Sequence, residues 1–337
     1  MAYRYDNLKL DKGMYRQAGS TFAQVLESMD PSEQYKGTSL ESLDAFQRQL
    51  KRFDIKVKGP GSDCVEKFFR TAESAVLFPE YISRCVRQGM EQGDILPHIT
   101  AAVTRFDGMD YRSIATETAE ENKKLAKVEE GEEIPSTSIK LQDNLIQLHK
   151  RGRMLVASYE TVRFQKLDVF SVTLRQIGAN IARSYLEDAV GVLMNGDGNE
   201  NAAAVDQVAA AGTLTYADLV DFWSKFDPYE MNTLLVSNDV MLQLLKLPEF
   251  QNPLAGQNFQ GSGKLITPMG ATLLRCAALP EGTIIGLDKH YALEMVEGCG
   301  VTVEYDKLID CQLERAAITT IGGFAKVFPG ASRVLEV

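Results

Sequence analysis

The side chains that most often carry out chemistry in proteins are scattered in this sequence. Its three histidines, His98, His149 and His290, lie in three different segments. None of them has a second ligand-type residue at the spacing of a known metal motif. We therefore expect histidines at the surface or at the boundary of the core, and we predict no metal site.

One segment looks superficially like a ligand loop. Asn195-Gly196-Asp197-Gly198-Asn199 alternates oxygen-bearing side chains with glycines, as calcium and phosphate loops do. The glutamate that closes a twelve-residue calcium loop is missing, because Gln207 and Val208 stand near its place. There is also no Lys-Ser/Thr pair of a phosphate loop. A tight turn that ends a helix is the better interpretation.

Motifs of catalysis and cofactor binding are missing as well. Gly261-Ser262-Gly263 and Gly322-Gly323 lack the strand, glycine and helix order of a dinucleotide site, and no Gly-x-Ser-x-Gly elbow occurs. We predict a protein that is not an enzyme and binds no cofactor. The alternative, an α+β enzyme with an unrecognised site, would need a pocket with convergent polar groups.

The cysteines and the net charge limit the remaining classes of protein. The five cysteines are odd in number and widely spaced, so we expect buried free thiols rather than disulfides or a zinc site. They are Cys64, Cys85, Cys276, Cys299 and Cys311. A formal net charge of −10 argues against a dedicated nucleic-acid reader, and no apolar stretch approaches the roughly 20 residues of a membrane span.

The clearest predicted element is a long helix that ends at the Asn-Gly turn. Apolar residues recur every three or four positions from Phe170 to Leu193, with charged residues on the opposite face. Asp168 is placed to cap the start of this helix, and Asn195-Gly196 is placed to end it. About 26 residues at 1.5 Å each make a rod of roughly 39 Å, which is long for a globular domain.

A long hairpin with an acidic tip is predicted before this helix. Strand-like patterns at 111–116 and 139–146 flank a segment rich in glutamate, with Lys123, Lys124 and Lys127 as its lysines. A segment this polar contributes no core, so we expect a projection that finds its partner on another molecule.

Further elements complete an α+β pattern. Before the hairpin, a helix is predicted over 39–55, where one apolar stripe runs along a chain segment too short to form its own core. Beyond the long helix, helices and strands alternate. The expected segments are helices at 216–226 and 239–246, and strands at 232–236, 271–276, 283–287, 291–296, 300–305 and 315–321.

This order of elements resembles the major capsid proteins of tailed bacteriophages, which have the Hong Kong 97 fold. The resemblance spans roughly residues 75 to 337 and is most specific at Val190–Gly198, the end of the long "spine" helix and its turn. Leu234–Met241 is similar to the strand and following helix of the family, and Leu265–Gly270 adds to the match. These motifs are diagnostic through their order.

The resemblance implies an N-terminal arm, an extended β-hairpin loop, a peripheral domain with the spine helix, and an axial domain. The implied segments are an arm at 1–75, peripheral domain at 76–108, extended loop at 109–155, peripheral domain with the spine helix at 156–194, axial domain at 195–299, a peripheral return at 300–311 and an axial closing segment at 312–337. The implied function is a capsid subunit that assembles through hexamers and pentamers into an icosahedral shell around the phage genome.

The resemblance also implies partners and a location. They are further copies of the chain, scaffolding, portal and decoration proteins, and enclosed double-stranded DNA without sequence-specific binding. Assembly would take place in the host cytoplasm and the product would be the virion. An encapsulin-like nanocompartment, which packages an enzyme in the same fold, is the nearest alternative.

Contacts between subunits are expected to be non-covalent. Some family members cross-link a lysine of the extended loop to an asparagine of the peripheral domain, but Asn258 is the last asparagine here, before the expected acceptor region. Charge can substitute, with the acidic loop tip docking on a basic patch of a neighbour. The candidate contact residues are Glu129, Glu130, Glu132 and Glu133 on the tip, and Lys150, Arg151 and Arg153 on the patch.

Overall fold

The chain folds into two compact units that both combine helices and strands. The computed structural model describes residues 4–16, 20–92, 95–106, 108, 110–116, 127, 130, 139–251, 267, 269–298 and 300–337. The first unit comprises residues 1–93, 151–182 and 301–320, and the second comprises 94–150, 183–300 and 321–337. The α+β class expected from the sequence is confirmed.

Short helices make up the beginning of the first unit. The α-helices are α1 (Phe22–Met29), α2 (Ala45–Arg52), α3 (Ala72–Ala75) and α4 (Leu77–Glu91). Between them lie the 3-10 turns η1 (Arg4–Asn7), η2 (Lys12–Arg16), η3 (Ser32–Tyr35) and η4 (Val65–Phe69). The helix predicted over 39–55 is shorter than expected, because Asp44 and Gln47 form a capping box that begins α2 at Ala45.

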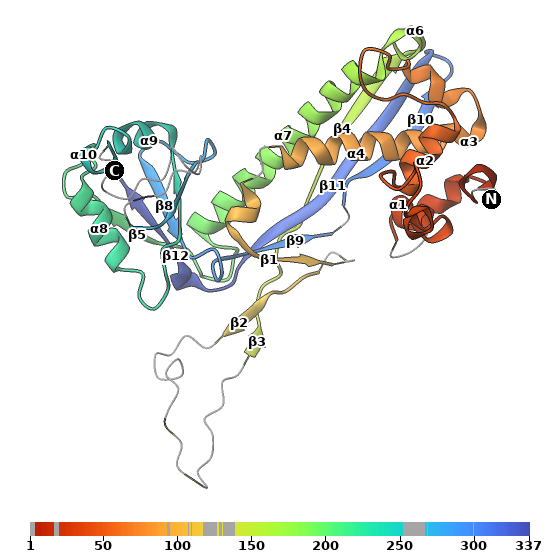
Figure 1. Ribbon diagram of the computed structural model, residues 1–337. Coiled ribbons are helices and arrows are strands. Elements are labelled where there is room, and N and C mark those ends of the chain that lie inside the picture. The colour runs from red at the N-terminus through yellow and green to blue at the C-terminus, as the bar shows by residue number, and fades with distance from the viewer. Residues whose placement is uncertain are drawn as a thin grey trace. The chain divides into compact units, whose positions relative to one another are not determined.

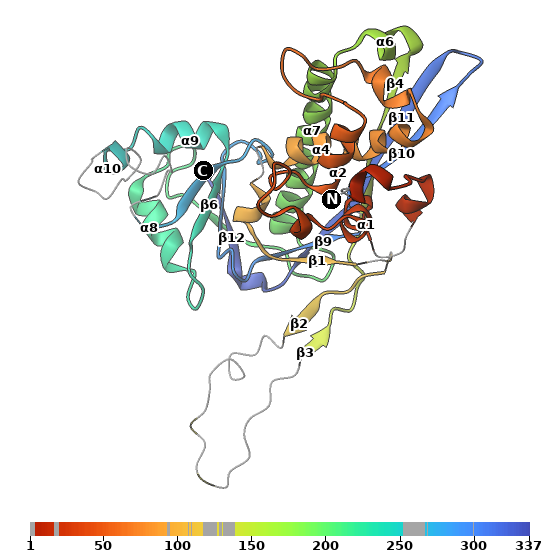
Figure 2. The same cartoon turned by 45° about the vertical axis from the view of Figure 1, so that its right-hand side comes forward.

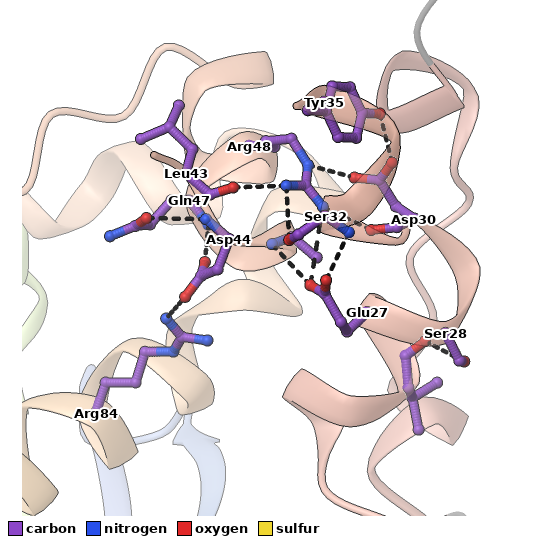
Figure 3. A network of polar contacts seen from close by, with 12 residues as sticks. Glu27, Ser28, Asp30, Ser32, Tyr35, Leu43, Asp44, Gln47, Arg48 and Arg84 are labelled. Carbon is purple, nitrogen blue, oxygen red and sulfur yellow. Dashed lines mark hydrogen bonds and ion pairs between the residues drawn. The ribbon is translucent and has the colours of Figure 1, made fainter. Parts of the chain in front are cut away.

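An arginine lies at the centre of this helical part. The side chains of Arg48 on α2 and of Asp30 after α1 are fully buried, and Nε of Arg48 donates to Oδ2 of Asp30 at 2.6 Å. The other guanidinium nitrogens donate to the Asp30 carbonyl, the Leu43 carbonyl and the Ser32 hydroxyl (Figure 3). Tyr35 completes the arrangement, since its hydroxyl donates to Asp30 at 2.5 Å.

Two helices of the first unit cross at glycines. The long predicted helix is confirmed as α7 (Leu167–Asn195), preceded by α6 (Tyr159–Phe164), and the part of α7 in this unit crosses α4 in both views (Figures 1 and 2). A Cβ at Gly178 would overlap the carbonyl of Val86, and one at Gly89 would overlap the carbonyl of Arg175. Close backbone approach therefore requires glycine at both positions.

The predicted cap of α7 is wrong. The helix already begins at Leu167, so Asp168 lies in its first turn rather than at the N-cap. The carboxylate remains near the positive end of the helix dipole, which is the same electrostatic preference that the capping argument used.

Three strands complete the first unit. They belong to β4 (His149–Ser158), β10 (Thr302–Leu308) and β11 (Leu313–Lys326). β10 and β11 pair antiparallel from Thr302 opposite Thr319 to Leu308 opposite Leu313, and β4 pairs with β11. Buried and partly buried residues alternate along β11 from Leu313 to Thr320, as expected of a sheet with one covered face.

The second unit contains a five-stranded sheet in the order β5-β12-β8-β6-β7. Its strands are β5 (Ala204–Gln207), β6 (Thr233–Val236), β7 (Thr272–Arg275), β8 (Thr283–Leu287) and β12 (Ser332–Glu336). The helices α8 (Tyr216–Ser224) and α9 (Asn238–Leu244) lie against it (Figure 2), and α10 (Pro248–Gln251) follows. Phe222, Leu244 and Ile284 belong to the core between these helices and the sheet.

The same unit holds a second group of paired strands. β1 (Thr100–Arg105) pairs in parallel with β9 (Leu293–Glu297), and β9 pairs antiparallel with the last residues of β11. The 3-10 turns η5 (Leu96–His98) and η7 (Pro329–Ala331) precede β1 and β12. Among the described residues, no helix has the length and apolar character needed to cross a membrane.

Candidate functional site at the root of the hairpin

The predicted hairpin is present as two short paired strands in the second unit. β2 (Ile114–Thr116) and β3 (Ile139–Leu141) pair antiparallel, with Ile114 opposite Leu141, and they lie side by side in Figures 1 and 2. Closer to the unit, Tyr111 bridges to Ile146. We call residues 111–116 and 139–146 the hairpin root. Each predicted arm contains a paired strand, but the strands are shorter than the predicted ranges 111–116 and 139–146. Most of the acidic tip lies outside the described residues.

One buried carboxylate holds the first arm of the root. Glu294, the second residue of β9, is only 7% exposed. It accepts hydrogen bonds from the Tyr111 hydroxyl at 2.6 Å, from the Ser113 hydroxyl at 2.5 Å and from the Thr104 hydroxyl. Burial, together with the hydrogen bond to Glu294, raises the pKa of Tyr111, so the phenol stays a donor.

The Asn-Gly-Asp-Gly-Asn turn holds the second arm. The side chain of Asn144 donates to the Gly198 carbonyl at 2.7 Å, and its backbone N–H donates to Oδ1 of Asn199 at 2.8 Å. Nε2 of Gln142 also points to Asp197, at 3.4 Å from Oδ2. Gly196 has φ +82, as expected of the residue that ends a helix, so the turn is confirmed. The turn also fixes the neighbouring strand, a role that its pattern did not indicate.

A buried lysine connects this turn to the end of α7. The side chain of Lys326, at the end of β11, is fully buried and donates from Nζ to the carbonyl of Leu193 at 3.2 Å. Its backbone N–H donates to Oδ2 of Asp197 at 2.8 Å. Burial lowers the pKa of Lys326 to about 8, and the Asp197 carboxylate opposes this shift. The ammonium therefore satisfies a carbonyl at the negative end of the helix.

A polar hollow adjoins the turn. Its volume is about 370 Å³, and its lining includes His149, Glu187, Asp188 and Asp197. Within the part of the chain that the structure describes, no three or more His, Cys, Asp or Glu side chains are grouped so as to hold a metal ion.

The predicted contact residues lie on two separate segments. Lys150 and Arg153 are exposed on β4, and Arg151 between them is partly buried. On the acidic side only Glu130 is described, and it is exposed, whereas Glu129, Glu132 and Glu133 lie outside the described residues. Contact between the two sets remains a prediction about different copies of the chain.

The histidines lie at the surface, whereas the described cysteines differ in burial. His98, His149 and His290 are all exposed, as predicted. Cys85 and Cys276 are buried free thiols, but Cys311 is exposed and Cys64 is partly exposed, so the expectation of buried thiols is wrong for these two. Cys311 lies in the turn between β10 and β11, where little packs over it; Cys299 lies outside the described residues.

Sequence reasoning missed Glu294 and Lys326 as structural centres. One signal was available for each, a charged residue inside an apolar run: Ala292-Leu293-Glu294-Met295-Val296 and Phe324-Ala325-Lys326-Val327-Phe328. Buried charges in such runs need partners, so they point to a polar network.

The sequence is similar to one known protein family, and the fold is similar to several solved structures. The sequence model of the family described as "Phage capsid protein" matches residues 142–308. No curated protein matches the chain by sequence.

Solved structures share the fold. A virus-like particle from Pyrococcus furiosus is 15% identical, with a TM-score of 0.53, and the match covers 77% of this chain and 99% of that one. The capsid of a native GTA particle is also 15% identical, with a TM-score of 0.53, over 72% of this chain and 89% of that one. The capsid of an empty GTA particle is 14% identical with a TM-score of 0.52, over 73% and 90%. Residues 142–308 thus match the phage capsid protein family, and the chain has the Hong Kong 97 capsid fold that its sequence resembles.

Proposed function

We propose that this chain is the major capsid protein of a tailed bacteriophage, which assembles through hexamers and pentamers into an icosahedral head around the genome. The observation that carries the proposal is a hairpin firmly rooted on a capsid-type fold, with arms that pair over only three residues each. So short a pairing is marginal by itself in water. A hairpin of this kind gains stability by lying on another subunit, and repetition of that contact builds a closed shell.

Apolar side chains on the root favour such a contact. Ile114 is 45% exposed, Leu141 64% and Leu145 44%. Complete burial of a leucine or isoleucine side chain contributes about 1.5–3 kcal/mol, so covering three half-exposed ones would contribute roughly 3 kcal/mol. A contact of this size is weak in one pair of subunits. It becomes strong when every subunit of a shell makes it.

Charge would direct the same contact. The acidic tip with Glu129, Glu130, Glu132 and Glu133 is proposed to dock on Lys150, Arg151 and Arg153 of a neighbouring copy. Exposed charges are screened over about 8–10 Å in physiological salt, so high salt should weaken assembly. Assembly that is equally efficient in low and in high salt would contradict this docking.

The proposed shell is held without covalent cross-links. Lys127 is exposed, but an acceptor asparagine after residue 258 is missing from the sequence. Denaturing electrophoresis of boiled particles should therefore give a single band of the monomer mass, 37.3 kDa. A ladder of higher masses would contradict the proposal.

The proposed role is structural rather than catalytic. With a net charge of −10, the inner surface should confine DNA without binding specific sequences. Scaffolding, portal and decoration proteins are the proposed further partners, with assembly in the host cytoplasm and the virion as the final location.

The first test is negative-stain electron microscopy of the purified protein in low and high salt. Closed particles, tubes or rings of five and six subunits are the expected result. A monodisperse monomer or dimer under all conditions, including co-expression with a scaffold, would overturn the shell function. The contents separate the two shell types, because nuclease-protected DNA favours the phage head and a stoichiometric cargo protein favours an encapsulin-like compartment.

A further inference from the structure

We propose that Glu294 is the positioning residue that sets the direction of the hairpin, and through it the ability of one subunit to reach the next. This inference rests on the proposed shell function. Glu294 itself is not proposed to touch a neighbouring copy. It acts through Tyr111 and Ser113, which belong to the hairpin root.

The backbone of Glu294 is fixed from both sides. In β9 it lies opposite Ala102 of β1 on one side and opposite Ala325 of β11 on the other. A residue in the middle of three paired strands has little freedom to move. Its carboxylate is thus a fixed point of the second unit.

The hydroxyl groups of Tyr111 and Ser113 attach the hairpin root to this fixed carboxylate. Ser113 is 1% exposed and directly precedes Ile114, the first residue of β2, so holding Ser113 defines where the strand departs. The second arm follows the first, because Gln142 donates its N–H to the Ser113 carbonyl at 2.9 Å and Ile146 donates to the Tyr111 carbonyl at 2.8 Å. One side chain therefore orients both arms.

The chemistry of the contact explains why a carboxylate is suited to this place. Both oxygens accept, Oε1 from Tyr111 and Thr104 and Oε2 from Ser113. Within the described residues, no lysine, arginine or histidine forms an ion pair with Glu294, and the hydrogen-bond partners of its side chain are the three hydroxyl groups. Short hydrogen bonds from O–H to a carboxylate are strong and directional. An apolar side chain would fill the same space without specifying a direction.

The test compares Glu294→Gln with Glu297→Gln. Both changes remove a carboxylate from β9, but Glu297 pairs with Arg105, whose side chain is 83% exposed, and among the described residues the Glu297 carboxylate forms no hydrogen bond with the hairpin root. Glu297→Gln is therefore a matched control. Nitroxide labels on Lys140→Cys in β3 and Glu281→Cys in the body of the second unit report the direction of the hairpin, with Cys64 and Cys311 replaced by serine.

We expect a defined label distance in the parent protein and in Glu297→Gln. In Glu294→Gln, the fraction of molecules outside that distance should rise about tenfold, equivalent to about 1.4 kcal/mol, because an amide cannot accept three hydroxyl hydrogen bonds. Particle yield should fall in the same variant. In a background of Tyr111→Phe and Ser113→Ala, Glu294→Gln should add little, since its partners are already missing.

The outcomes separate the inference from the proposed function. If Glu294→Gln keeps the parent distance and forms normal particles, the positioning role is refuted. If the parent chain never assembles, the shell function fails, and the label distances still decide whether Glu294 orients the hairpin. Should Glu294→Gln fail to fold, Tyr111→Phe, which keeps the carboxylate, provides the same comparison; an unchanged distance in that variant would likewise refute the role.

Discussion

Replacing Arg48 by methionine should destabilise the helical part of the first unit. The guanidinium makes four hydrogen bonds at 2.6–3.0 Å, two of them to Asp30, and its carbon lies 4.3 Å from the centre of the Tyr35 ring. Methionine keeps most of the side-chain volume but leaves the buried Asp30 carboxylate without its guanidinium partner. Removing one partner of a buried ion pair costs about 3–5 kcal/mol. Because the Tyr35 hydroxyl still donates to Asp30, we expect about 3 kcal/mol.

Hydrogen exchange measures the loss of stability locally, at the amides of α2. The chain has two compact units, so a global unfolding curve would mix their contributions. The amides of α2, residues 45–52, should lose about two decades of protection, which corresponds to about 3 kcal/mol. Arg87→Met on α4 is the control, because that side chain is 43% exposed and its contact with Glu80 is 3.8 Å long.

Two results would refute the reasoning. One is protection of α2 that is unchanged in Arg48→Met. The other concerns the double variant Arg48→Met with Asp30→Leu, which removes both buried charges and should recover part of the lost stability. If the double variant is less stable than Arg48→Met alone, the buried carboxylate is not the source of the loss.

Three further predictions concern helix packing, pH and salt. Gly178→Ala should destabilise the crossing of α4 and α7 by about 1–3 kcal/mol, measured by hydrogen exchange of the helix amides, whereas Gly191→Ala on the same helix meets open space and should stabilise by about 0.5–1 kcal/mol; equal effects would contradict the close approach. The pKa of Lys326 lies below the ordinary 10.5, so stability should rise as pH increases from about 8 to 10.5, and this rise should be absent from the pH dependence of Lys326→Met. Replacing the exposed Lys150 and Arg153 by glutamine should make particle yield, scored by electron microscopy, insensitive to salt; a yield that still falls with salt places the docking patch elsewhere.

Local patterns in the sequence were sufficient to predict several helices and strands. The periodic spacing from Phe170 to Leu193 predicted α7, and the strand predicted at 283–287 is found as β8. The acidic segment between two strand-like patterns predicted the hairpin and its two arms. In each case the signal lies within one element, where periodicity and turn residues report directly on burial.

Other features depend on contacts that no local pattern contains. β4 begins with the polar and charged residues His149-Lys150-Arg151-Gly152-Arg153, which do not show the apolar alternation that predicts a strand. Its pairing with β11 brings together residues that are far apart in the chain. The bonds of Glu294 to the hairpin join residues 181 and 183 positions apart. The Asp30–Arg48 pair joins two helices whose relative placement the sequence does not reveal.

The distance along the chain between the hairpin and its anchor has a consequence for synthesis. The arms at 111–116 and 139–146 leave the ribosome long before Glu294 and Lys326 have been made. Contacts between such distant segments form late in folding, because the entropic cost of closing the long intervening loop precedes the stabilisation that the contacts provide. A nascent subunit would thus carry an unanchored hairpin until β9 and β11 emerge. The order of synthesis itself would delay the contacts between subunits until β9 and β11 have been made.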